Sequence, residues 1–286
     1  MTLRQRLTAP DILIAPGVYD GLTAALATDA GFEALYLSGA AVAYTRLGRP
    51  DIGLSTASEM TDTMALIADR TDLPVIMDAD TGFGNALNAR RTMQSYERAG
   101  ASALQVEDQT YPKKCGHLSD KSLILKEEMA GKIAAMADAR RHDTLIIART
   151  DAIAVEGFDA AIDRAGSYID AGADVLFIEA PRDSGELSRI ADTFKGRVPL
   201  LANMVEGGAT PISSATTLED MGFDIVIFPG GIVRALARSA QDYYASLKAT
   251  GSNKAFSDRM HDFDGLNAAI GTPEMLALGK RFDGKS

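Results

Sequence analysis

Eight short apolar segments recur along the chain, and stretches of helical character separate them. Each segment has the length of a β-strand and reads as a continuous apolar run, which is typical of strands that are covered on both faces. Such strands belong to parallel sheets with helices packed against them. The segments are Ile12–Ala15, Ala34–Ser38, Pro74–Asp78, Ala103–Glu107, Leu145–Arg149, Val175–Glu179, Pro199–Asn203 and Ile225–Phe228.

A repeated phrase introduces every second segment. In each phrase a glycine stands where a helix must end and the chain must turn back into the sheet. The phrases are Asp29-Ala30-Gly31-Phe32, Arg98-Ala99-Gly100-Ala101, Asp170-Ala171-Gly172-Ala173 and Asp220-Met221-Gly222-Phe223. A strand–helix unit repeated eight times predicts an α/β protein of the (β/α)₈ TIM-barrel type with right-handed crossovers. A doubly wound open sheet is the alternative, but no Gly-x-Gly-x-x-Gly pattern follows the first segment.

The chain after Gly251 differs in kind from the repeats. The spacing of its apolar residues predicts two short amphipathic helices joined at residues 271–273. We therefore expect a barrel over residues 1–250 and a helical extension over residues 251–286. Such an extension must bury its apolar face against this subunit or a neighbouring one. The apolar residues are Phe256, Met260, Phe263, Leu266, Ile270, Met275, Leu276 and Leu278.

Charge and composition exclude several classes of partner. The 286 residues carry a formal net charge of −10 with no basic segment to offset it, so neither nucleic acid nor an anionic membrane is expected as a partner. No stretch approaches the ~20 apolar residues of a membrane-spanning helix, and the N-terminal residues do not resemble a signal peptide. The single cysteine, Cys115, permits no internal disulfide. These features predict a cytoplasmic protein.

The segment around this cysteine is polar. Lys113 and Lys114 precede Cys115, and His117 follows it by two residues. Cations at such short range favour the thiolate over the thiol, so Cys115 is expected to be unusually acidic and reactive. The alternative is an inert buried cysteine, whose neighbours would usually be apolar.

Charged side chains stand at the carboxyl ends of several segments, where a barrel carries its active site. Asp78, Asp80 and Glu107 come from adjacent segments, and their mutual repulsion would raise their pKa values unless a cation lies among them. Mg²⁺ prefers oxygen ligands and commonly takes one or two direct carboxylates. The residues therefore predict a Mg²⁺ site. The alternative is that the aspartates cap the following helix or pair with Arg149.

Motifs spread over nearly the whole chain resemble those of the isocitrate lyase/phosphoenolpyruvate mutase superfamily. Lys113-Lys114-Cys115-Gly116-His117 is similar to the signature of its carbon–carbon lyase branch. The resemblance implies a barrel that depends on Mg²⁺ (or Mn²⁺) and exchanges its eighth helix between subunits. It also implies a homotetramer built as a dimer of helix-swapped dimers, and a loop around Cys115 that closes over the substrate. The other motifs are Tyr36–Gly39, Pro50-Asp51, Asp78–Gly84, Ala148–Asp151 and Phe177–Ala180.

The same resemblance implies roles for individual residues. Mg²⁺ would lie near Asp78, Asp80 and Glu107, and Cys115 would be the general acid. The further catalytic candidates are Lys113 and His117 beside the thiol, and Tyr36 and Glu179 as alternative bases. The substrate-binding candidates are Ser38, Gly39 and the amide of Ala40 for the α-oxyacid, Arg149 for a carboxylate, and Asp51, Gly116, Asn203 and Val205 around the pocket.

Two positions depart from the pattern of the superfamily. Ala40 replaces the second glycine of a common Ser-Gly-Gly turn, although its backbone amide is retained. Val205 stands where lyases acting on tricarboxylates resemble one another in a threonine, and a valine cannot donate a hydrogen bond to the third carboxylate. The run from Asn203 to Pro211 is more similar to the dimethylmalate lyase and petal-death-protein subgroup, which acts on malates with small alkyl groups.

The resemblance therefore implies cleavage of a 2-hydroxy dicarboxylate, such as 2,3-dimethylmalate or another 2-alkylmalate, by retro-aldol (retro-Claisen) chemistry. An α-keto acid such as pyruvate and a carboxylic acid would form. The alternatives are cleavage of 2-methylisocitrate, decarboxylation or hydrolysis of oxaloacetate, a phosphonate-bond reaction, and a non-enzymatic barrel that binds an oxyacid. The sequence leaves the physiological substrate, the pathway and the base open.

Overall fold

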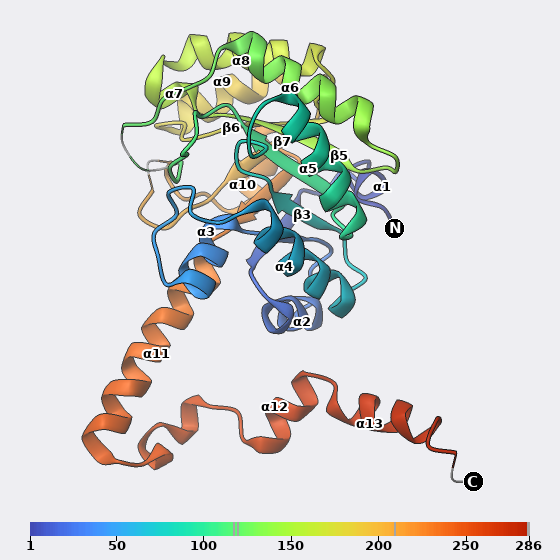
Figure 1. Ribbon diagram of the computed structural model, residues 1–286. Coiled ribbons are helices and arrows are strands. Elements are labelled where there is room, and N and C mark those ends of the chain that lie inside the picture. The colour runs from blue at the N-terminus through green and yellow to red at the C-terminus, as the bar shows by residue number, and fades with distance from the viewer. Residues whose placement is uncertain (117, 119, 209, 285–286) are drawn as a thin grey trace. The chain divides into compact units, whose positions relative to one another are not determined.

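Eight parallel strands form a closed barrel in the computed structural model, which describes residues 1–116, 118, 120–208 and 210–284. Neighbouring strands pair in chain order, and β8 pairs with β1 to close the sheet (Figure 1). The predicted (β/α)₈ fold is confirmed, with a strand inside or across each predicted segment. The strands are β1 Leu13–Val18, β2 Leu35–Leu37, β3 Val75–Asp78, β4 Ala103–Glu107, β5 Leu145–Thr150, β6 Val175–Ile178, β7 Leu200–Asn203 and β8 Ile225–Phe228.

Helices follow the strands and form an outer layer around the barrel (Figure 1). Helix α5 packs against α6, α6 against α8, and α2 against α4. Among the described residues, no helix has both the length and the apolar composition of a membrane-spanning segment. The helices up to β8 are α1 Leu3–Arg6, α2 Gly21–Asp29, α3 Gly39–Val42, the π-helix η1 Ala43–Leu47, α4 Ala57–Arg70, α5 Ala86–Arg98, α6 Lys126–Ala139, α7 Ala152–Val155, α8 Phe158–Asp170, α9 Ser184–Phe194 and α10 Ala215–Met221.

The barrel interior is a packed apolar core. Alternate strand residues contribute to it, for example Leu145 and Ile147 of β5. Leu3 of the short N-terminal helix belongs to the same cluster and is only 2% exposed. Because the interior is filled in this way, function must be sought at the ends of the strands.

The chain divides into two compact units, residues 1–232 and 233–286. The division falls within α11 Gly231–Thr250, so the assignment of residues 251–286 to a separate extension stays a prediction. Helix α13 Thr272–Lys280 lies where the spacing predicts the second helix. The first predicted helix, which included Phe256 and Met260, is divided in the structure into the 3₁₀ helix η2 Asn253–Arg259 and the helix α12 Phe263–Ala269. Apolar side chains of this second unit are exposed, including Phe263 at 82%.

Candidate active site

Buried charged side chains gather at the carboxyl ends of the strands. Asp78 ends β3 and Glu107 ends β4, while Asp151 and Glu179 directly follow β5 and β6. All four are buried, with exposed fractions between 0% for Asp151 and 7% for Asp78. Charges are costly to bury without partners, so this end of the barrel is built for a purpose other than stability. It is also the end at which TIM barrels carry their active sites.

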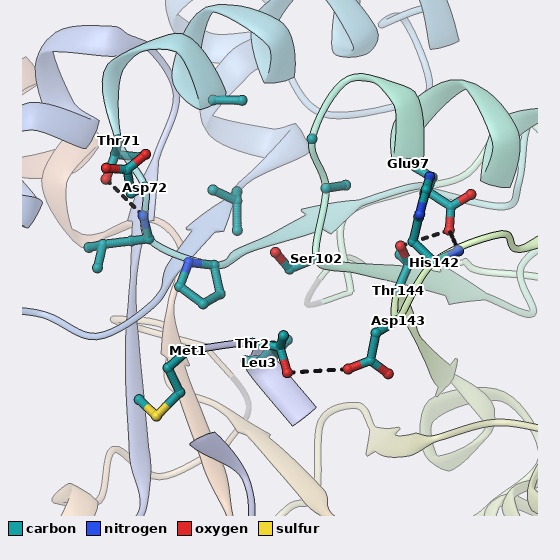
Figure 2. A pocket seen from close by; sticks show the side chains of 16 residues that line it. Met1, Thr2, Leu3, Thr71, Asp72, Glu97, Ser102, His142, Asp143 and Thr144 are labelled. Atoms are coloured by element: carbon teal, nitrogen blue, oxygen red, sulfur yellow. Dashed lines mark hydrogen bonds between the residues drawn. The ribbon is translucent and has the colours of Figure 1, made fainter. Parts of the chain in front are cut away.

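A cavity of about 430 Å³ lies at the opposite, amino-terminal ends of the strands. Pro74, Ser102 and Thr144, which precede β3, β4 and β5, line it (Figure 2). Glu97 there accepts hydrogen bonds from the amide of His142 and the hydroxyl of Thr144. Burial acts to raise the pKa of Glu97, but hydrogen bonds from the backbone and from Thr144 lower it below its ordinary value. Glu97 thus stabilises the turn before β5 through these hydrogen bonds, which is a structural role.

Asp78 is held by hydrogen bonds from three directions. Its Oδ1 accepts from the amide of Asp80 at 3.1 Å and from Nε2 of Gln105 at 3.5 Å, and its Oδ2 accepts from the amide of Gly39 at 3.3 Å. Gln105 in turn accepts a hydrogen bond from the Tyr36 hydroxyl at 2.5 Å. Burial and the charge of Asp78 raise the pKa of Tyr36 well above its ordinary value. Tyr36 therefore keeps its proton and acts here as a donor.

Lys113 lies among the carboxylates. Its Nζ is 2.6 Å from Oδ1 of Asp51 and 2.7 Å from Oδ1 of Asp80. Burial acts to lower the pKa of Lys113, but these carboxylates raise it well above its ordinary value. Burial also raises the pKa of Asp80 to about 6, although Lys113 acts in the opposite direction. Lys113 therefore pairs with two carboxylates of the site, whereas the sequence predicted that it acts on Cys115.

Glu107 provides a test of whether a cation fits this site. One oxygen, Oε2, pairs with Nη1 of Arg149 at 3.2 Å, whereas Oε1 is buried with no hydrogen-bond partner among the described residues. Burial raises the pKa of Glu107 well above its ordinary value despite Arg149. In the described part of the chain, no three or more His, Cys, Asp or Glu side chains form a group that could hold a metal ion. The unpartnered Oε1 of Glu107 fits a Mg²⁺ that takes one or two direct carboxylates and completes its shell with water or substrate oxygens.

The turn after β2 lies beside Asp78. The Ser38 hydroxyl accepts a hydrogen bond from the amide of Ala41 at 3.2 Å and thereby caps α3. A Cβ atom at Gly39 would lie 2.9 Å from Oδ2 of Asp78, so this close approach requires glycine. The structure thus places Gly39 of the predicted turn against Asp78, while Ser38 caps the helix that contains Ala40.

Arg149 occupies a fixed position in a network of carboxylates. Its Nε and Nη2 donate to the two oxygens of Asp151 at 3.0 and 3.1 Å. The distance from Nε to Oε2 of Glu179 is 3.8 Å, and the guanidinium lies 5.2 Å from the ring centroid of Phe177. Burial acts to lower the pKa of Arg149, but Asp151 and Glu107 raise it well above its ordinary value. The result is an oriented, permanent cation that suits a substrate carboxylate.

Asn203 and Glu179 form a second polar pair. Nδ2 of Asn203 lies 3.1 and 3.4 Å from the two oxygens of Glu179. The other side-chain atom, Oδ1 of Asn203, is buried without a hydrogen-bond partner among the described residues. Val205 follows two residues later and is buried at 8% exposure. Its predicted contact with substrate stays a prediction.

The cysteine-bearing loop is docked against these residues. The amide of Cys115 donates to the backbone carbonyl of Asp51 at 3.1 Å, and Cys115 itself is half-buried. A Cβ atom at Gly116 would lie 2.4 Å from Nη2 of Arg149 and 2.8 Å from Cγ of Glu179. Only glycine allows the loop backbone to lie this close. His117, the remaining catalytic candidate, lies outside the described residues.

Two residues of the site were missed from the sequence. Gln105 is 0% exposed and joins Tyr36 to Asp78. A polar side chain within an otherwise apolar strand was the signal that could have revealed it. The second residue is Lys121, whose Nζ is 2.7 Å from Oδ1 of Asp151. No local pattern marks Lys121, because its partner lies 30 residues away in the chain.

The chain matches known proteins over nearly its full length. Residues 3–248 match the family model described as phosphoenolpyruvate phosphomutase. The 2,3-dimethylmalate lyase of Eubacterium barkeri is 41% identical over 270 residues, which cover 94% of this chain and 93% of that protein. The 2-methylisocitrate lyase of Aeropyrum pernix is 46% identical over 261 residues, which cover 91% of this chain and 83% of that protein.

Solved structures give the same assignment. An oxaloacetate acetylhydrolase in complex with 3,3-difluorooxalacetate has a TM-score of 0.94 at 32% identity, covering 100% of this chain and 97% of that one. A 2,3-dimethylmalate lyase, described as a phosphoenolpyruvate (PEP) mutase/isocitrate lyase superfamily member, has a TM-score of 0.93 at 35% sequence identity, covering 99% of this chain and 97% of that one. A phosphonopyruvate hydrolase in complex with oxalate and Mg²⁺ has a TM-score of 0.89 at 31% sequence identity, covering 99% of each chain. The chain therefore belongs to the PEP mutase/isocitrate lyase superfamily and is a carbon–carbon lyase within it.

Proposed function

We propose that the chain cleaves a 2-alkylmalate, with 2,3-dimethylmalate as the reference substrate, to pyruvate or a related α-keto acid and a carboxylic acid. The observation that carries the substrate class is the buried, apolar Val205, which stands two residues after the Asn203 end of β7. A side chain that cannot donate a hydrogen bond suits an alkyl group better than a third carboxylate. The 2,3-dimethylmalate lyase among the relatives supports the same choice.

Different polar groups of the site would perform the separate steps of such a cleavage. The turn at Ser38 and Gly39 holds the α-oxyacid end, and Arg149 holds a carboxylate. Glu179 is the better of the two base candidates, because the Tyr36 hydroxyl donates a hydrogen bond to Oε1 of Gln105 and the pKa of Tyr36 is raised. Loss of the C2 hydroxyl proton then drives cleavage of the C2–C3 bond, and the departing carbanion takes a proton from the Cys115 thiol.

Asp78, Asp80 and Glu107 are the residues that would hold a divalent cation in this proposal. The unpartnered Oε1 of Glu107 and the raised pKa of Asp80 support the assignment. The phosphonopyruvate hydrolase structure with oxalate and Mg²⁺ supports Mg²⁺ as that cation, with Mn²⁺ as an alternative. Mg²⁺ would supply Lewis-acid stabilisation of the oxygen charge that develops at C2.

The assembly that we propose is a homotetramer in which α11 is exchanged between subunits. Only Val233 of α11 is buried, although this helix follows β8 in the chain and is therefore the eighth helix of the strand–helix repeat. Exposed apolar residues continue beyond it, among them Phe263, Met275 and Leu276. A neighbouring subunit would cover such a surface. The cytoplasmic location stays a prediction from composition.

A second candidate function is cleavage of 2-methylisocitrate. It is favoured by the 46% identity to the lyase of Aeropyrum pernix. This relative shares more identical positions in the aligned region than the dimethylmalate lyase does, although the alignment covers less of it. Overall similarity therefore does not separate the two substrates, and the residues near the end of β7 carry the distinction.

The substrate assignment is tested by comparing turnover efficiency across a panel of acids. The panel contains 2,3-dimethylmalate, other 2-alkylmalates, 2-methylisocitrate and oxaloacetate, and α-keto acid release is measured with and without Mg²⁺. We expect the highest kcat/KM with an alkylmalate. A higher kcat/KM with 2-methylisocitrate than with every alkylmalate would contradict the substrate assignment and leave the lyase mechanism intact.

Val205→Thr is expected to shift the preference towards 2-methylisocitrate. The added hydroxyl restores a charge-assisted hydrogen bond worth ~1.5–3 kcal/mol, or roughly ten- to a hundredfold in specificity. An alkyl group loses contact worth about 0.8 kcal/mol per buried methylene. The measurement is the ratio of kcat/KM for 2-methylisocitrate to that for 2,3-dimethylmalate.

Val198→Thr is the matched control for this variant, because Val198 precedes β7 by two residues at the opposite end of the strand. It should leave the ratio unchanged. If Val205→Thr has an unchanged melting temperature and an unchanged ratio of kcat/KM for the two substrates, then residue 205 does not contact the distal end of the substrate.

A further inference from the structure

Lys121 connects the cysteine-bearing loop to the floor of the site. Its side chain is only 1% exposed. The ammonium group donates one hydrogen bond to the backbone carbonyl of Gly116 and another to Oδ1 of Asp151, the latter at 2.7 Å. A buried ammonium is retained only where such acceptors compensate for lost hydration. Lys121 thus spans from the residue after Cys115 to a carboxylate at the end of β5.

Asp151 is a rigid anchor for this contact. Its amide donates to Oδ1 of Asp108 at 3.0 Å. Oδ2 of Asp108 accepts from the Thr150 hydroxyl at 2.7 Å and from the Tyr168 hydroxyl of α8 at 2.8 Å. Both oxygens of Asp151 also accept from Arg149. The anchor is therefore fixed to a strand and a helix of the barrel, and one carboxylate orients both Arg149 and Lys121.

The close packing of Gly116 shows why the contact matters. The missing Cβ of Gly116 would lie 2.4 Å from Nη2 of Arg149, so the loop backbone lies directly against the guanidinium. The carbonyl of the same glycine is the one that Lys121 holds. Any change in the distance between Gly116 and Arg149 also moves Cys115, which precedes Gly116 in the chain.

We propose that Lys121 is a positioning residue that holds the Cys115–Gly116 segment against Arg149 by bridging the Gly116 carbonyl and Asp151. That this positioning serves proton transfer from Cys115 rests on the proposed function, whereas the bridge itself does not. Lys121 touches neither the substrate-binding turn at Ser38 and Gly39 nor the carboxylates Asp78 and Asp80 in the contacts described. It acts through the placement of the thiol, and its loss should affect the chemical step more than binding.

Lys121→Met retains the length of the side chain and removes its hydrogen bonds. We expect kcat to fall by about ten- to a hundredfold, the range for loss of a buried charge-assisted hydrogen bond, while KM changes by less than about threefold. The second readout is the alkylation rate of Cys115 by iodoacetamide, which is specific because the chain has a single cysteine. With saturating oxalate and Mg²⁺, alkylation should be at least about threefold faster in the variant than in the wild type.

Lys126→Met is the matched control. Its ammonium pairs with Asp163 at 2.6 Å on the surface, with 31% of the side chain exposed. This variant should match the wild type in kcat, KM and alkylation rate. Lys121→Gln, which restores hydrogen-bonding capacity without charge, provides a second test if Lys121→Met has a much lower melting temperature.

Three outcomes would overturn the proposal: wild-type kcat in a folded Lys121 variant, a fall in kcat without faster alkylation, or a rise in KM alone. Failure of the proposed function is distinguishable from these outcomes. If the wild type cleaves no 2-hydroxy acid and binds no oxalate, the substrate assignment fails. The alkylation rates without ligand then decide whether Lys121 holds the loop, with equal rates in the wild type and Lys121→Met overturning the inference.

Discussion

Cys115→Ser is expected to lower turnover by roughly 10²- to 10⁴-fold, the usual contribution of a positioned general acid. A serine hydroxyl is a far weaker acid than a thiol, so it cannot deliver a proton to the departing carbanion at a comparable rate. The substitution is nearly isosteric, and the amide of residue 115 keeps its hydrogen bond to the carbonyl of Asp51. Oxalate affinity, measured by calorimetry with Mg²⁺ present, should therefore stay within about threefold of the wild-type value.

Cys115→Ala is the companion variant. If the thiol is the proton donor, the turnover of Cys115→Ser and of Cys115→Ala should be lowered to a similar degree, because neither side chain is an adequate acid. Wild-type turnover in Cys115→Ser would assign Cys115 a structural role. An intact rate in serine combined with a large loss in alanine would instead indicate that a hydroxyl or thiol is needed only for hydrogen bonding.

The barrel was predictable because its information is local and repeated. Each strand reads as a continuous apolar run, and glycines such as Gly100 and Gly172 adopt the positive φ values that end a helix. The break between η2 Asn253–Arg259 and α12 Phe263–Ala269 was not predictable in the same way. The apolar spacing continues through Phe256, Met260 and Phe263, so it gives no signal that the helix is interrupted. The π-helix at Ala43–Leu47 likewise has no sequence signature in this chain.

Part of the site was predictable because strand order determines which residues meet. Adjacent parallel strands place Asp78, Glu107 and Arg149 at one end of the barrel, so the list of strand-end residues already contained them. Side-chain pairing was not predictable. Lys113 was expected to act on Cys115, whereas in the structure it pairs with Asp51 and Asp80, and the first of these lies 62 residues away in the chain.

Metal removal tests the predicted role of the carboxylate cluster. Excess EDTA is expected to abolish turnover, and Mg²⁺ or Mn²⁺ in excess of the chelator should restore it. Mg²⁺ should also raise the melting temperature of the wild type, because a ligand that binds the native state stabilises it. Full turnover in excess EDTA would refute the metal assignment.

Asp80→Asn is expected to lose most of this dependence together with roughly 10³-fold or more of turnover. Asp80 has φ 45°, a left-handed conformation that asparagine tolerates far better than alanine, so the exchange removes the charge with little backbone strain. Loss of one carboxylate from a hydrated Mg²⁺ site weakens the binding of the ion. Lys113 still has Asp51 as an ion-pair partner in this variant. Mg²⁺ should therefore no longer raise the melting temperature of this variant.

Asp138→Asn is the charge-matched control for this variant. Asp138 is a surface carboxylate that is 74% exposed and pairs with Arg90, so its exchange should leave the protein like the wild type. If Asp80→Asn keeps both its turnover and the Mg²⁺-dependent rise in melting temperature, Asp80 is not part of the metal site, and its raised pKa reflects only burial and the neighbouring carboxylates of Asp78 and Asp51.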